Sequence, residues 1–189
     1  MKREQTELPD ERLILGINWG AIEEKGWFGA KGYLSVDLDL NLVVISASGK
    51  VLSEHNWKNK TTNMIRLSGD DTTGDIFIND GLDNEYAILD LSYLDETNRL
   101  LAFVNNYTVQ ELGKLGHFDY RIYTGQPNHP EKVHYFSDLT KVKDFDRAFG
   151  IFLGTFQWQD EKMIYRPMEY CLTQQGERQQ LKEALSILS

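Results

Sequence analysis

Acidic side chains are concentrated in two stretches of the chain that contain no lysine or arginine. Residues 67–98 hold nine carboxylates, and residues 32–49 hold two more, Asp37 and Asp39. The remainder has 18 acidic and 20 basic residues, so the net charge of −9 comes from these two stretches. Carboxylates that crowd together without nearby bases either stay solvated or bind a cation. A cation site is therefore the first chemistry that the sequence suggests.

The spacing of Asp37 and Asp39 favours a shared ligand face. Both lie in residues 33–46, where apolar and polar residues alternate through the middle, which is typical of a half-buried strand. Side chains two residues apart on a strand point to the same side, roughly 6.5–7 Å apart. One ion could bridge the two carboxylates, or each could ligate one of two neighbouring ions. A solvated outer face is the alternative.

Two further motifs supply oxygen donors of several kinds. The sequence GDDTTGD at 69–75 interleaves carboxylates, hydroxyls and glycines, and DNE at 83–85 adds more donors ahead of a new strand. The glycines allow turns that bring backbone carbonyls toward the same point. Calcium takes six to eight such oxygen ligands, and no neighbouring histidine or cysteine favours zinc. The spacing is not that of an EF-hand.

Short segments of strand-forming residues separated by turn signals predict an all-β chain. Turns are expected at 49–50 and 79–81, and a loop with two prolines at 126–131. This spacing of short strands is typical of an antiparallel β-sandwich or barrel. The expected strands are 13–17, 33–46, 64–68, 75–78, 86–91, 99–107, 118–123, 132–136, 149–157 and 163–170.

Only the C-terminal segment has a helical pattern. In residues 177–188, Leu181, Ala184, Leu185 and Leu188 recur at steps of three and four, which gives one apolar stripe on a short helix. We expect this helix to pack against the edge of the sandwich. A helix that binds a partner is the alternative.

Composition and length fit one soluble domain. The chain has 189 residues, of which 41% are hydrophobic and 26% charged. The lone Cys171 excludes a disulfide framework, and no apolar run reaches the ~20 residues of a membrane helix. The first residues lack the apolar stretch of a secretory signal, so we expect a cytoplasmic location. The negative charge disfavours nucleic acid as a partner.

The order of these motifs resembles the TerD family, calcium-binding β-sandwich proteins of tellurium-resistance and stress-response systems. The resemblance covers residues 12–172 and implies a TerD-like β-sandwich domain over that range, followed by a helical tail at 173–189. Residues 149–170 resemble the closing hairpin of the family. The matching segments are LILGINWG (13–20), DLDLNLVVIS (37–46), GKV (49–51), WKNK (57–60), GDDTTGD (69–75), DNE (83–85), AILDLSYLD (87–95) and GHFDYRIYTG (116–125).

The resemblance implies a calcium site formed by the strand, the glycine-containing loop and the DNE motif. This chain departs from the family pattern at Gly20 and Asn84, where the family has aspartates, and each departure removes one carboxylate. The number of bound ions is therefore left open. The implied ligands are Asp37, Asp39, Asp70, Asp71, Thr73, Asp75, Asp83, Asn84 and Glu85.

The function implied by the resemblance is that of a non-enzymatic calcium-binding protein of the tellurite-resistance and stress-response type. The ion would order the acidic loops, which would then present a surface to protein partners of a stress-response complex. A calcium-dependent module that binds anionic lipid or carbohydrate is the alternative, with Trp27 and Phe28 as a candidate membrane contact. An enzyme is not expected, because the sequence supplies no nucleophile or positioned base beyond the acids.

Overall fold

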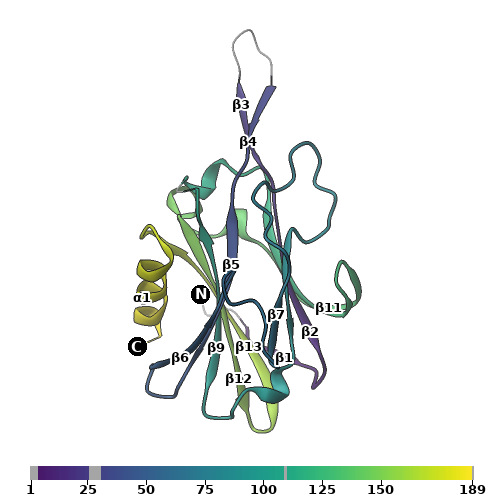
Figure 1. Ribbon diagram of the computed structural model, residues 1–189, viewed down its shortest axis with the longest axis vertical. Coiled ribbons are helices and arrows are strands. Elements are labelled where there is room, and N and C mark those ends of the chain that lie inside the picture. The colour runs from purple at the N-terminus through teal and green to yellow at the C-terminus, as the bar shows by residue number, and fades with distance from the viewer. Residues whose placement is uncertain (1–3, 26–30, 109, 189) are drawn as a thin grey trace.

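The chain folds into two antiparallel sheets packed face to face, with a separate two-stranded hairpin at one end (Figure 1). The computed structural model describes residues 4–25, 31–108 and 110–188. The first sheet contains, in pairing order, β1 (Thr6–Leu8), β13 (Lys162–Leu172), β12 (Gly150–Gln159), β9 (Arg99–Asn106), β5 (Leu38–Ile45) and β6 (Val51–His55). The second contains β11 (His129–Asp138), β10 (Phe118–Gln126), β2 (Leu13–Trp19), β8 (Glu85–Leu89) and β7 (Ile65–Leu67). The hairpin pairs β3 (Ile22–Lys25) with β4 (Lys31–Leu34).

The predicted all-β sandwich with a short C-terminal helix is confirmed. Side chains from both sheets form one hydrophobic cluster, which includes Ile17 and Tyr120 from the second sheet and Leu40 and Leu153 from the first. Short 3₁₀ turns lie at Leu91–Tyr93, Leu112–Lys114, Leu139–Lys141 and Phe145–Arg147. None of the helices in the described part of the chain has the length and apolarity needed to cross a bilayer.

The strand expected at 33–46 is two strands, and its second half is buried on both faces. The chain leaves β4 after Leu34 and enters β5 at Leu38, so Asp37 lies just before β5 and Asp39 within it. Every residue of β5 is buried, including Asp39 and Asn41. The expectation of a half-buried strand was wrong because a second layer covers the outer face of the first sheet.

That second layer is α1 (Glu177–Ile187). Leu181 and Ala184 pack with Val43, Phe103 and Phe152 in a second hydrophobic cluster on the outer face of the first sheet. Figure 1 shows α1 lying against this sheet, so the expectation that the helix packs at an edge is corrected. The physical reason is that Val43, Ile45, Phe103 and Phe152 make part of the outer face of β5, β9 and β12 apolar, and these side chains need a cover.

Several boundaries differ from those expected. The segment 75–78 is not a strand, because only Asp75 forms a bridge, to Gly20, and the residues after it are exposed. The expected loop at 126–131 is a tight hairpin turn, in which Asn128 takes the left-handed conformation with φ of 63°. Strands β1, β3 and β6 were not anticipated. Of these, β1 precedes residue 12 and pairs with β13.

Candidate metal centre

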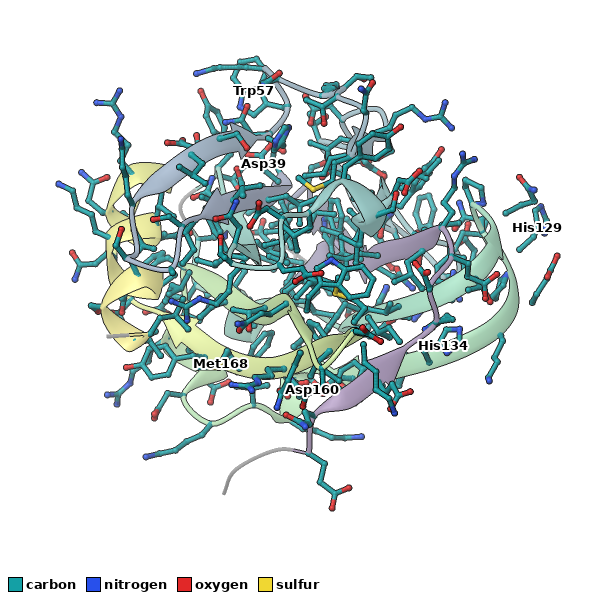
Figure 2. The ribbon with its side chains drawn as sticks, turned by 90° about the horizontal axis from the view of Figure 1, so that it is seen from below. Asp39, Trp57, His129, His134, Asp160 and Met168 are labelled. Carbon is teal, nitrogen blue, oxygen red and sulfur yellow. The ribbon has the colours of Figure 1, made fainter. Side chains whose placement is uncertain are left out.

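Three carboxylates from two elements converge at the start of β5. Asp37 and Asp39 come from the entry to β5, and Asp70 comes from the loop after β7. One carboxylate oxygen from each lies within 4.8 Å of the others. The three residues line a pocket of about 170 Å³ together with Trp57 and Tyr107. Figure 2 shows Asp39 and Trp57 on the same side of the molecule.

Burial and repulsion by neighbouring carboxylates raise the pKa values of Asp37 and Asp39. The pKa of Asp39 is raised to about 7, first by burial and then by Asp37 and Asp70. The pKa of Asp37 is also raised, by burial and by the charges of Asp70 and Asp71. An ionised cluster of this kind is unfavourable unless a cation neutralises it. The described residues that line the pocket include no lysine or arginine.

Two buried oxygens at the cluster have no hydrogen-bond donor among the described residues. They are Oδ1 of Asp37 and Oδ1 of Asn105. Asn105 lies opposite Asp39 in the β5–β9 pairing, and its side chain hydrogen-bonds to Asp39. Buried acceptors without donors are uncommon in folded proteins, since each loses its interaction with water. Their presence beside three carboxylates fits a hard cation such as calcium, which binds oxygen ligands.

Glu85 lies next to the cluster but its oxygens are already bonded. Its Oε2 accepts a hydrogen bond from the backbone N–H of Leu40 at 2.9 Å, and its Oε1 accepts one from the N–H of Asp71 at 3.4 Å. The pKa of Glu85 is raised to about 8, first by burial and also by the neighbouring Asp39 and Asp70, while the hydrogen bonds from Leu40 and Asp71 act to lower it. Glu85 therefore links β8 to β5 and to the loop that carries Asp70.

Asp71 organises its own loop. Its Oδ1 accepts hydrogen bonds from the N–H of Thr73 at 2.8 Å, from the hydroxyl of Thr73 at 2.8 Å, and from the N–H of Gly74 at 3.1 Å. These hydrogen bonds lower its pKa despite burial. Gly74 has φ of 66°, and a Cβ there would meet the Trp19 ring at 2.6 Å, so only glycine fits. The GDDTTGD motif thus fixes the loop that holds Asp70.

Asn84 and Asp75 extend this loop network toward β2. The side-chain amide of Asn84 donates to Asp71 at 3.2 Å and to Asp75 at 3.5 Å, while its oxygen accepts from the N–H of Trp19 at 2.7 Å. Asp75 also lies 3.3 Å from the Nε2 of His117. These contacts place Asn84 and Asp75 as structural links between the loop and the second sheet.

The structure does not bring Asp83 to the cluster. Its carboxylate accepts hydrogen bonds from Nε of Arg121 at 2.8 Å and from the hydroxyl of Tyr123 at 2.7 Å. Gly16 of β2 leaves the space that this carboxylate occupies, because a Cβ at Gly16 would overlap it. Burial raises the pKa of Asp83 even though Arg121 and Tyr123 lower it. Asp83 is thus engaged in an ion pair with β10.

The nine sequence-predicted ligands therefore separate into three groups. Asp37, Asp39 and Asp70 converge, with Glu85 beside them. Asp71, Thr73, Asp75 and Asn84 hold the loops, and Asp83 pairs with Arg121. Sequence reasoning missed Asn105, Trp57 and Tyr107 as neighbours of the cluster. Trp57 does stand in the WKNK segment that contributed to the family resemblance, whereas Asn105 and Tyr107 carry no local signal. Trp27 and Phe28 lie outside the described residues.

Comparison with known proteins supports the fold. No protein-family model matches the chain, and no curated protein matches it. Among solved structures, the chain is similar to the crystal structure of a homologue of the telluride resistance protein TerD from Streptomyces coelicolor A3(2). The TM-score is 0.69 at 11% sequence identity, and the match covers 95% of this chain and 98% of the other. The resemblance to the TerD family is therefore confirmed at the level of the fold, and the chain has a TerD-like β-sandwich.

Proposed function

We propose that the protein is a non-enzymatic calcium-binding β-sandwich of the tellurite-resistance and stress-response type. The convergence of Asp37, Asp39 and Asp70 around oxygens that lack donors carries this proposal. These three residues would hold the ion, with backbone carbonyls and water completing a shell of six to eight oxygens. Apart from the three carboxylates and the Tyr107 hydroxyl, the described residues that line the pocket supply no nucleophile or base.

The ion would act on the loops rather than on a substrate. It would neutralise three carboxylates that otherwise repel one another, and it would join the entry of β5 to the loop after β7. The ordered surface would then bind protein partners of a stress-response complex in the cytoplasm. This role matches the hydrogen bonds by which Glu85 and Asp71 already tie the same segments together.

A calcium titration by calorimetry on EDTA-stripped protein tests the proposal. We expect binding heat with calcium and much weaker binding of magnesium, because magnesium demands a small octahedral shell and dehydrates reluctantly. The stoichiometry counts the ions. Absence of heat with calcium, together with an unchanged melting temperature, would reject the proposal.

Calcium binding should strengthen as the pH rises from 6 to 8. The pKa of Asp39 is raised to about 7, so this carboxyl group is largely protonated at pH 6 and must release its proton to ligate. We expect an affinity roughly tenfold lower at pH 6 than at pH 8. Calorimetry at the two pH values measures the difference, and equal affinities would place Asp39 outside the ligand shell.

The calcium-free protein should show the opposite trend in stability. The folded-state pKa of Asp39 lies above its unfolded value of 3.8, so the folded protein binds more protons between about pH 4 and pH 7. The contribution of Asp39 to stability is therefore present at low pH and is lost as the pH rises through that window. Melting curves recorded in EDTA and in calcium at each pH separate this effect from that of the ion.

A calcium-dependent module for carbohydrate is the second candidate. Trp57 and Tyr107 line the same pocket as the three carboxylates and are 41% and 64% exposed. Exposed aromatic faces beside an ion with open coordination positions could stack on a sugar ring. A glycan array probed with and without calcium distinguishes this function, because binding that requires both calcium and Trp57 would favour it.

A further inference from the structure

Large apolar side chains are exposed on the loop between β7 and β8. Phe77 and Ile78 are 80% and 79% exposed, and Ile76 is 38% exposed. The ring of Phe77 packs edge-on against Tyr33 of β4, with 5.2 Å between the ring centroids. Tyr33, Ile76, Phe77 and Ile78 form what we call the loop patch. Figure 1 shows the long β7–β8 connection beside the base of the β3–β4 hairpin.

The backbone that carries the loop patch is held at both ends. On one side, the N–H of Asp75 donates to the carbonyl of Trp19, and the N–H of Ala21 donates to the carbonyl of Asp75, both at 2.9 Å. On the other side, the oxygen of Asn79 accepts from Nδ2 of Asn18 at 3.0 Å. Nη2 of Arg121 also donates to the carbonyl of Gly81 at 3.1 Å. A loop fixed in this way presents its apolar side chains in one arrangement, which lowers the entropic cost of binding.

The chain segment that carries Ile76, Phe77 and Ile78 is acidic, and Arg121, which reaches this segment at Gly81, is paired with Asp83. Residues 67–98 contain nine carboxylates and no lysine or arginine. Asp80 lies exposed two residues after Ile78, and the exposed Glu23 pairs with Tyr33 across the hairpin. The carboxylates attract a positively charged partner and repel an anionic membrane, while the exposed apolar side chains offer that partner a hydrophobic contact.

We infer that the loop patch docks a basic segment of a partner protein, one in which lysine or arginine side chains flank aromatic or aliphatic ones. The inference deepens the proposed function, on which it rests, by naming the chemistry of the partner. The hydrogen-bond chain from Asp71 through Asn84 to Asp75 connects the loop patch to the loop that carries Asp70. The ion site and the docking surface therefore share one rigid support.

A phage-displayed library of random 12-residue peptides tests the inference. The full chain is the bait, in calcium and in parallel in EDTA. We expect enrichment of peptides that combine basic and large apolar residues. Their synthetic versions should bind the Phe77→Ser/Ile78→Ser variant at least about tenfold more weakly than the unchanged protein. Phe136→Ser is the matched control, because Phe136 is 58% exposed on β11 and should leave the affinity unchanged.

Three outcomes would overturn the inference. The first is a selection that enriches no basic apolar peptides. The second is enriched peptides that bind the double variant as tightly as the unchanged protein. The third is binding to vesicles of phosphatidylcholine and phosphatidylserine that depends on Phe77 and Ile78, which would assign the loop patch to a membrane. The calcium titration reports on the ion site alone, so failure of the proposed function can be told apart from failure of the docking surface.

Discussion

Asp39→Asn should weaken calcium binding at least about 100-fold, equivalent to ~2.7 kcal/mol of binding free energy. Asp39 is the most buried of the three converging carboxylates, at 5% exposure, and one of its oxygens lies within 4.8 Å of an oxygen of Asp37 and of Asp70. An amide of the same shape keeps an oxygen but removes the full negative charge that a hard cation requires. Calorimetry on EDTA-stripped protein measures the loss.

The same substitution should have the opposite effect on the calcium-free protein. Because Asp37 and Asp70 repel the ionised Asp39, removing its charge relieves the cluster and should raise the melting temperature in EDTA at pH 8. Relief of about 1 kcal/mol corresponds to roughly 2–4 °C for a chain of this size. Calcium at a hundred times the Kd of the unchanged protein should stabilise that protein by ~2.7 kcal/mol but the variant by only ~0.4 kcal/mol.

Glu96→Gln is the matched control for Asp39→Asn. Glu96 belongs to the same base-free acidic stretch but is exposed and lies outside the converging group. Its replacement also removes one negative charge and should change neither the calcium affinity nor the melting temperature. If Glu96→Gln weakened binding as much as Asp39→Asn, calcium would be responding to overall charge rather than to a site. A lower melting temperature for Asp39→Asn in EDTA would mark Asp39 as a structural residue.

The fold was predictable from sequence because the strand signals are local. Turn residues and short apolar runs placed β2, β9, β10, β12 and β13 within a few residues of their observed positions. The burial of the outer face of β5 was harder to predict from the sequence, because Val43 and Ile45 are covered by a helix more than 130 residues further along the chain. No sequence pattern within β5 itself indicates that α1 packs against it.

The site could be predicted only as a set of candidates. Neighbours in one motif diverge, because Asp70 joins the cluster while Asp71 turns back onto the N–H groups of Thr73 and Gly74. Both are aspartates in the same loop, so the residue types cannot separate their roles. The separation comes from backbone torsions and from groups supplied by other strands, such as Arg121 of β10 for Asp83.

The structural similarity at 11% sequence identity shows that few specific residues are required for this fold. The similarity to the TerD homologue extends over 95% of this chain, while most positions differ. Gly16, beneath Asp83, and Gly74, against Trp19, are positions where a larger side chain would collide with its neighbours. At such a position the neighbouring side chain leaves no room for a Cβ atom, so glycine is required. The sequence alone could not show that Asp83 lies against Gly16 or that Trp19 lies against Gly74.

Asp83→Asn should lower the free energy of unfolding by about 3 kcal/mol and leave calcium affinity unchanged. The carboxylate side chain is 1% exposed and pairs with Arg121, which is itself only 17% exposed. The substitution removes a buried countercharge from the guanidinium, and the amide keeps only one of the two oxygens that accept from Arg121 and Tyr123, so one of these donors loses its acceptor. For a chain of this size the melting temperature in EDTA should fall by roughly 6–12 °C.

A double-mutant cycle with Arg121→Met distinguishes a structural ion pair from a metal ligand. If Asp83 acts through Arg121, the double variant should be less destabilised than the sum of the single variants, with a coupling of 1 kcal/mol or more, on the order of that found for contacting charges. If Asp83 instead ligates the ion, Asp83→Asn should weaken calcium binding as Asp39→Asn does, and Arg121→Met should not alter its effect. Asp39 and Asp83 are both aspartates in acidic motifs of the same chain, so opposite results from the two variants would show that the partner each carboxylate meets in the fold decides its role.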